Sequence, residues 1–102
     1  MTKPTSMSRP LHVLVVDDAG DHAELVREMV RFAGAWPDAV VDKAESYASA
    51  LDALGRQTYD LAFFDYWLGH EDGLALMREI RERGISTPVI VLTGHGAEEI
   101  AV

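Results

Sequence analysis

The chain has 102 residues, of which 48% are hydrophobic, and a formal net charge of −8 at pH 7. This length and apolar content suffice for one domain with a single core. There is no cysteine, which excludes a disulfide framework and thiolate metal sites. The acidic balance argues against nucleic acid as a direct partner, because such binding needs basic side chains that displace counterions from phosphates. The apolar runs are too short to cross a bilayer and no secretion signal opens the chain, so we expect a soluble, cytoplasmic protein with no membrane partner.

Predicted strands and helices alternate along the chain. Residues 1–10 are rich in Ser, Thr and Pro and are expected to form a disordered lead-in. The alternation that follows, with its short connections, predicts right-handed crossovers and an α/β fold with a doubly wound parallel sheet. Residues 66–72 are expected to be a loop, and 97–102 to begin a further helix. Strands are predicted at about 11–17, 39–43, 60–65 and 89–93, and helices from near 21, over 46–55 with Ser46 as N-cap, and over 73–83.

Three carboxylates close the two strands that carry the functional signal. Asp17 and Asp18 follow the apolar run 11–16, and Asp65 follows the apolar run 61–64. Strands that are apolar on both faces belong to a covered parallel sheet, in which the carboxyl ends meet at one edge. If the first strand is central, the winding reverses between the first and third strands and the three carboxylates converge. Oxygen ligands with no His or Cys nearby favour Mg²⁺, which also lets a carboxylate attack phosphorus.

Each of these signals has a plainer explanation when taken alone. Asp17 and Asp18 could form a turn that caps the next helix, and Thr93 could be a loop or capping residue. The four histidines, His12, His22, His70 and His95, lack the spacing of metal ligands and are expected to be ordinary surface or loop residues. The site interpretation depends on the combination of features.

That combination consists of Val15-Val16-Asp17-Asp18, Asp65, Gly73 eight positions later, and Pro88-Val89-Ile90-Val91-Leu92-Thr93-Gly94. Thr93 lies twenty-eight positions beyond Asp65. With these features the chain resembles the receiver domain of two-component response regulators over residues 11–102. The resemblance implies a flavodoxin-like fold, with four parallel strands in the order 2-1-3-4.

The resemblance also implies roles for individual residues. Asp65 would be the phosphoacceptor, and Thr93 would be the switch residue that turns towards the phosphate. Asp17, Asp18 and Asp65, with the backbone carbonyl of Trp67, would bind Mg²⁺. The implied partner is a histidine kinase or a histidine phosphotransfer protein, and the implied role is phosphorelay signalling rather than enzymatic turnover.

Two departures from the family pattern bear on this interpretation. Gly69 stands where family members usually carry Pro, and we expect it to loosen the loop after the phosphoacceptor. The family's phosphate-pairing Lys on the fifth strand has no counterpart, since Lys3 and Lys43 are the only lysines and neither matches that position. The domain over 11–102 is therefore interpreted as a truncated receiver without the fifth strand and last helix. Its strand at 89–92 would be an unpaired edge, through which we expect self-association.

Two alternatives remain. The chain could be a phosphate-insensitive, self-associating interaction domain derived from a receiver. It could also be a Mg²⁺-dependent phosphatase with an aspartyl nucleophile, as in the haloacid dehalogenase group. That group carries a second Asp two residues after the nucleophile, where this chain has Trp67, so we rank the enzyme last.

Overall fold

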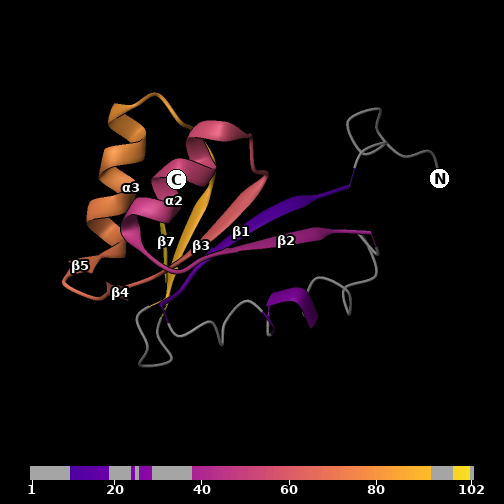
Figure 1. The fold of residues 1–102 in the computed structure, drawn as a ribbon, viewed down its shortest axis with the longest axis horizontal. Helices are drawn as coiled ribbons and strands as arrows, with labels where there is room; N and C mark the ends of the chain where they lie inside the picture. Colours follow the sequence, from indigo (N-terminus) through magenta and orange to yellow (C-terminus); the bar gives the residue numbers. More distant parts are fainter. Residues whose placement is uncertain (1–9, 19–23, 25, 29–37, 93–97, 102) are drawn as a thin grey trace.

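The computed structural model describes residues 10–18, 24, 26–28, 38–92 and 98–101. They form a five-stranded sheet in the order β2-β1-β3-β6-β7, together with a two-stranded β4-β5 sheet (Figure 1). All but Pro10 of the predicted disordered lead-in, most of the first predicted helix and Thr93 lie outside the described residues. The elements are β1 (His12–Val16), β2 (Val40–Ala44), α2 (Tyr47–Arg56), β3 (Leu61–Asp65), β4 (Trp67–Leu68), β5 (Glu71–Asp72), α3 (Gly73–Glu82), β6 (Val89–Leu92) and β7 (Glu98–Ala101).

Four strands of the main sheet are parallel and confirm the predicted order. β1 pairs with β2 on one side and with β3 on the other, and β3 pairs with β6. The predicted order 2-1-3-4 is therefore observed, with β6 as the fourth strand. In β1, Val13 to Val16 are fully buried, as expected for a central strand that is apolar on both faces.

Helices α2 and α3 cover one face of the sheet (Figure 1). Ser46 caps α2 as predicted, because its hydroxyl accepts a hydrogen bond of 3.0 Å from the Ser49 N–H. On the opposite face, Val26 lies in a described piece of helix and packs with Val13 and Val15. The core under α2 and α3 includes Leu14, Val16, Ala50, Leu54, Phe64, Leu76, Ile80 and Val91. In the part of the chain that is described, no helix is long and apolar enough to cross a membrane.

The segment predicted as a loop after β3 contains a β-hairpin. Strands β4 and β5 pair in antiparallel fashion, with Trp67 opposite Asp72 and Leu68 opposite Glu71. The two-residue connection begins with Gly69 at φ 71°, the position at which a type II′ turn requires glycine. Proline cannot adopt a positive φ, so this tight turn needs a residue such as Gly69, and the expected loosening of the loop stays a prediction.

The last described strand overturns two predictions. Residues 98–101 form β7, antiparallel to β6, with Leu92 opposite Glu98 and Val89 opposite Ala101. The prediction of a helix beginning at 97–102 is therefore wrong, and so is the prediction of an unpaired edge at 89–92. A helix of about one turn is unstable by itself, whereas the edge of β6 offers main-chain groups that need partners. Pairing along the sheet edge therefore prevails over local helix propensity.

Candidate metal site at the carboxyl edge of the sheet

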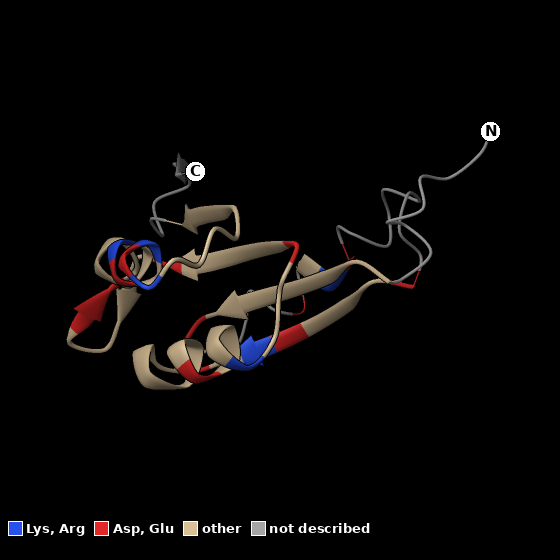
Figure 2. Cartoon of the chain, turned by 90° about the horizontal axis from the view of Figure 1, so that it is seen from above, with Lys and Arg blue, Asp and Glu red and all other residues tan. Residues whose placement is uncertain are grey.

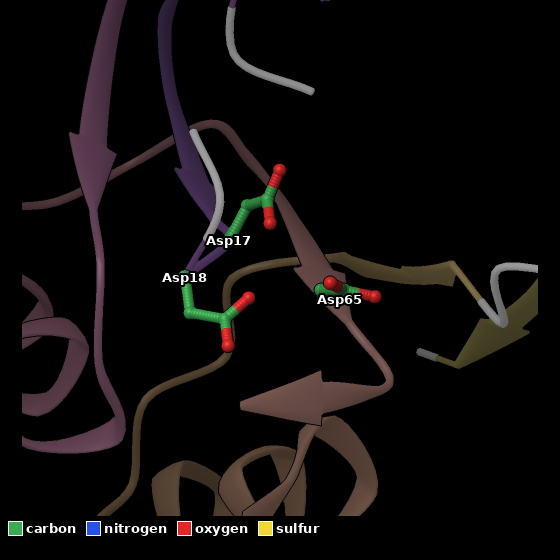
Figure 3. Close-up of side chains that lie close together, drawn as sticks. All are labelled: Asp17, Asp18 and Asp65. Atoms are coloured by element: carbon green, nitrogen blue, oxygen red, sulfur yellow. The ribbon is translucent and has the colours of Figure 1, made fainter. Parts of the chain in front are cut away.

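Three carboxylates converge where β1 and β3 end. Asp17, Asp18 and Asp65 each offer an oxygen atom, and these atoms all lie within 4.8 Å of one another. Asp17 is only 1% exposed, Asp18 is exposed and Asp65 lies between them in exposure. Figure 3 shows the three side chains grouped at the ends of their strands. Their convergence is the geometry that the apolar strand pattern predicts.

The register of the parallel sheet produces this grouping. Val16 pairs with Phe64, so the residues that follow them, Asp17 and Asp65, leave adjacent strands at the same level. The Asp17 N–H also donates a hydrogen bond of 3.0 Å to the carbonyl of Ala44, which continues the ladder towards β2. The two carboxylates are thus positioned by main-chain pairing on rigid strands.

The residues that follow Asp65 are also positioned by main-chain hydrogen bonds. The Tyr66 N–H donates to the Leu92 carbonyl at 2.7 Å, and the Gly73 N–H donates to the Tyr66 carbonyl at 2.7 Å. A Cβ atom at Gly73 would lie 2.5 Å from the Asp65 carbonyl oxygen. Gly73 therefore allows the start of α3 to approach the backbone of Asp65. The sequence pattern contained Gly73, but its steric role became visible only in the structure.

The position of Trp67 in the hairpin leaves its carbonyl pointing outward. In an antiparallel ladder, residue pairs that exchange main-chain hydrogen bonds alternate with pairs that do not. Tyr66 and Gly73 are joined by a main-chain hydrogen bond, so the neighbouring pair, Trp67 and Asp72, is one that exchanges none. The Trp67 carbonyl is therefore directed away from β5. Its indole is 60% exposed and contacts the Tyr66 ring edge-on, with ring centroids 4.9 Å apart.

The remaining predicted site residue, the switch Thr93, lies outside the described residues. Of the two lysines, neither of which was expected to serve the site, Lys3 also lies outside the described residues. Lys43 lies on β2 and pairs with Glu45 at 3.0 Å. The switch role of Thr93 therefore stays a prediction.

The chemistry of the cluster favours a hard divalent cation. Like charges at this separation repel one another, and a cation relieves the repulsion. Carboxylate and carbonyl oxygens without nitrogen or sulfur ligands suit Mg²⁺, which retains several water ligands and uses one or two protein carboxylates. The donor set therefore fits Mg²⁺.

A different carboxylate environment occurs near the start of β1. A single oxygen of Asp42 is within hydrogen-bond distance of three side chains: His12 Nε2 at 2.7 Å, the Tyr59 hydroxyl at 2.8 Å and Gln57 Nε2 at 3.1 Å. Burial by itself raises the pKa of Asp42, but these hydrogen bonds, led by that from Tyr59, outweigh it and lower the pKa below the ordinary 3.8. Burial and the bond to Asp42 raise the pKa of Tyr59 to about 12. This cluster is already provided with protein donors.

Comparison with known proteins identifies the family. The model of the response regulator receiver domain matches residues 13–102, so the chain belongs to this family and is a phosphorelay signalling domain. The family resemblance of the sequence is thereby confirmed. The flavodoxin-like fold is confirmed as well, since a receiver domain described as CheY-like from Methylobacillus flagellatus has a TM-score of 0.68.

Individual relatives agree with this assignment. The chain is 30% identical over 92 residues to the transcriptional regulatory protein ZraR of Escherichia coli, covering 90% of the chain and 20% of ZraR. It is 30% identical, with a TM-score of 0.61, to the response regulator TrrA of Thermotoga maritima solved with Mg²⁺-BeF, covering 72% of the chain and 60% of TrrA. The chain spans between 11% and 20% of the length of the first curated relatives.

Proposed function

We propose that this receiver accepts a phosphoryl group on Asp65 from a histidine kinase or a histidine phosphotransfer protein, and changes its partner contacts as a result. The observation that carries the proposal is the convergence of Asp17, Asp18 and Asp65 within 4.8 Å in a chain of the receiver family. Asp65 closes a buried strand and is itself partly exposed, so a donor has access to its carboxylate. This arrangement suits a nucleophile presented at a sheet edge.

Asp17, Asp18, Asp65 and the Trp67 carbonyl are the proposed Mg²⁺ ligands. The outward direction of that carbonyl and the oxygen-only donor set support this assignment. The bound ion would neutralise charge on the carboxylate and on the incoming phosphoryl group. The TrrA complex with Mg²⁺-BeF shows that a relative binds such an ion with a phosphoryl mimic.

In the proposed transfer, a carboxylate oxygen of Asp65 attacks the phosphorus of a phosphohistidine. The new O–P bond forms as the P–N bond breaks, and the imidazole nitrogen leaves with the electron pair. Main-chain bonds at Tyr66 and Gly73 keep the Asp65 backbone in place, so the nucleophile is pre-positioned. Thr93 remains the proposed switch, with its hydroxyl as donor to a phosphoryl oxygen.

Labelling by a small phosphodonor such as acetyl phosphate tests the proposal. Wild type should gain one phosphoryl group in the presence of Mg²⁺ and lose the labelling when EDTA removes the ion. Asp65→Asn should abolish labelling, while Asp52→Asn, on the exposed surface of α2, should retain it. Failure of the wild type to label under conditions that label another receiver would contradict the proposal.

The phosphate-insensitive, self-associating domain remains the second candidate, because Lys43 is engaged with Glu45 and does not serve the site. The pairing of β6 with β7 means that association through the β6 edge requires β7 to leave. Light scattering with and without beryllofluoride separates the two candidates: a change of mass or of spectrum with the phosphate mimic rejects the insensitive domain.

Sustained turnover of a phosphomonoester would instead indicate a phosphatase. A cytoplasmic location and the absence of a direct nucleic-acid partner stay predictions.

A further inference from the structure

The indole of Trp67 stands out on the surface of the described part of the chain. Only two large hydrophobic side chains there are exposed, Val40 at 43% and Trp67 at 60%. Trp67 lies two residues after Asp65, whereas Val40 pairs with His12 at the opposite end of the sheet. The larger of the two exposed apolar side chains is therefore placed beside the candidate phosphoacceptor.

The proposed metal site does not explain this side chain. A backbone carbonyl serves as a ligand whatever side chain the residue carries, so Mg²⁺ binding makes no demand for an indole. Packing does not explain it either, because alternation along β4 sends Leu68 into the core at 5% exposure and turns Trp67 outward. The indole is left available for an interaction with another molecule.

The hairpin presents this side chain on a firm support. Its turn is set by Gly69, its base is tied by the Gly73–Tyr66 main-chain bond, and Asp72 caps α3 by accepting the Ala75 N–H at 2.7 Å. The edge-on contact with Tyr66 further orients the ring. A large aromatic side chain on a rigid element loses little conformational entropy on binding, which is typical of interface hot spots.

The strand that pairs with β4 is acidic, and Asp72 lies directly opposite Trp67. β5, which contains Glu71 and Asp72, is the red arrow at the left of Figure 2 and lies directly opposite β4. Asp18 is exposed in the carboxylate cluster, and the chain as a whole carries −8. A surface that complements this region has an apolar pocket surrounded by Lys or Arg side chains.

We propose that Trp67 is the apolar anchor by which this receiver binds the protein that donates the phosphoryl group. The donor surface that fits carries a hydrophobic pocket, rimmed by basic side chains, next to its phosphohistidine. The inference rests on the proposed function, since it names the partner contact of the same site. It assigns the indole to recognition of the donor protein, and the neighbouring carboxylates to the chemistry.

Phosphotransfer from a protein and from a small molecule separates these roles. Histidine kinases encoded in the same genome are purified and autophosphorylated with ATP, and the one that labels the wild-type chain fastest is used as donor. KM and kcat are then measured for wild type, Trp67→Ala and Val40→Ala, and the rate of labelling by acetyl phosphate is measured for each. Thermal melts establish that all three proteins are folded.

Trp67→Ala should raise KM for the kinase about tenfold or more, the loss typical of a central aromatic contact, and should reduce kinase transfer far more than acetyl phosphate labelling. Val40→Ala should leave both reactions unchanged. For the wild type, KM for the kinase should rise with ionic strength, since the partner surface is basic.

Four results would overturn the inference. An unchanged KM in Trp67→Ala means that the indole is no anchor, and an equal loss with both donors means that it acts on the chemistry. A lower mass of Trp67→Ala in light scattering means that the indole binds a second copy of the chain. If neither donor labels the wild type, the proposed function fails first and the inference fails with it.

Discussion

Carboxylates in the parallel sheet occur in two different environments. Near the start of β1, three side-chain donors surround one oxygen of Asp42 and lower its pKa. At the carboxyl end, Asp17, Asp18 and Asp65 bring oxygens within 4.8 Å of one another. The first arrangement gathers donors around a charge, and the second gathers like charges. The first stabilises the fold, whereas the second adds repulsion that a cation would relieve.

This difference teaches how a functional carboxylate differs from a structural one in the same sheet. Removal of the negative charge at Asp42 should destabilise the protein. Removal of the negative charge of Asp18, the exposed carboxylate at the carboxyl edge, should stabilise the metal-free protein while weakening cation binding. The sign of the stability change, measured without metal, therefore distinguishes the two kinds of site.

The largest expected effect concerns the shape that holds the carboxyl edge. Gly73→Ala places a Cβ atom 2.5 Å from the Asp65 carbonyl oxygen, and β3 or the start of α3 must shift to accommodate it. We expect the free energy of unfolding to fall by about 3 kcal/mol, as for overpacking at a rigid site. Mg²⁺ binding should weaken as well because the Asp65 backbone moves. Urea denaturation and Mg²⁺ titration measure the two effects.

Gly55→Ala is the matched control for that substitution. Gly55 lies within α2, and a Cβ atom there would meet nothing within 4 Å. The same chemical change should raise the free energy of unfolding by up to about 1 kcal/mol, through helix propensity alone. Similar destabilisation by both variants would show that contact with Asp65 is not the cause.

Asp42→Asn tests the other carboxylate environment. The substitution removes the charge that accepts hydrogen bonds from His12, Tyr59 and Gln57, and we expect a loss of about 1.5 kcal/mol, reduced by partial exposure of the site. Because the pKa of Asp42 is lower in the folded than in the unfolded chain, its contribution is present above about pH 3.8 and is lost as pH falls through the folded value. The difference between wild type and variant should therefore shrink in acid.

Asp52→Asn provides the control for that experiment. Asp52 forms an exposed i,i+4 pair with Arg56 at 3.0 Å on α2. Such a pair contributes at most about 0.5 kcal/mol, so the variant should unfold almost like the wild type. An Asp42→Asn variant as stable as Asp52→Asn would mean that the donors around Asp42 add nothing to stability.

Tyr59→Phe measures how much one of the three donors to Asp42 contributes to stability. Loss of one of the three donors should cost about 1 kcal/mol at pH 7. The pKa of Tyr59, raised to about 12, means that the stabilisation is present below pH 10 and is lost as pH rises through 12. Spectrophotometric titration should show the loss of one phenol that ionises near pH 12. Combination with Asp42→Asn should be less than additive, because the two groups share one bond.

The order of the four parallel strands and the meeting of the three carboxylates were predictable from sequence. The parallel sheet and a common edge for the carboxylates follow from strands that are apolar on each face and end in Asp, whereas the strand order followed from the resemblance to receiver domains. The N-cap at Ser46 was predictable because it is a local interaction. The N-cap and the apolar strand pattern need no knowledge of which distant segments are in contact.

The features that the sequence did not reveal depend on contacts between segments. β7 forms because the edge of β6 offers pairing that local propensity at 97–102 does not include. The β4–β5 hairpin needs only two residues per strand, too few for any periodicity, and its sign in the sequence was Gly69. The role of Gly73 depends on the carbonyl of Asp65, a contact across the β3–α3 connection.

Asp18→Asn should change the free energy of unfolding least, but the sign of that change distinguishes the two kinds of carboxylate. Asp18 is the exposed member of the cluster, so its repulsion with the other two carboxylates is screened, and we expect the metal-free variant to be more stable by about 0.5 kcal/mol. Mg²⁺ at one hundred times its Kd should stabilise the wild type by about 2.7 kcal/mol, and the variant by less at the same concentration. Thermal melts with EDTA and with Mg²⁺ measure both quantities. A variant that is less stable than wild type without metal, and equally stabilised by Mg²⁺, would show that Asp18 belongs to the structural kind of carboxylate represented by Asp42.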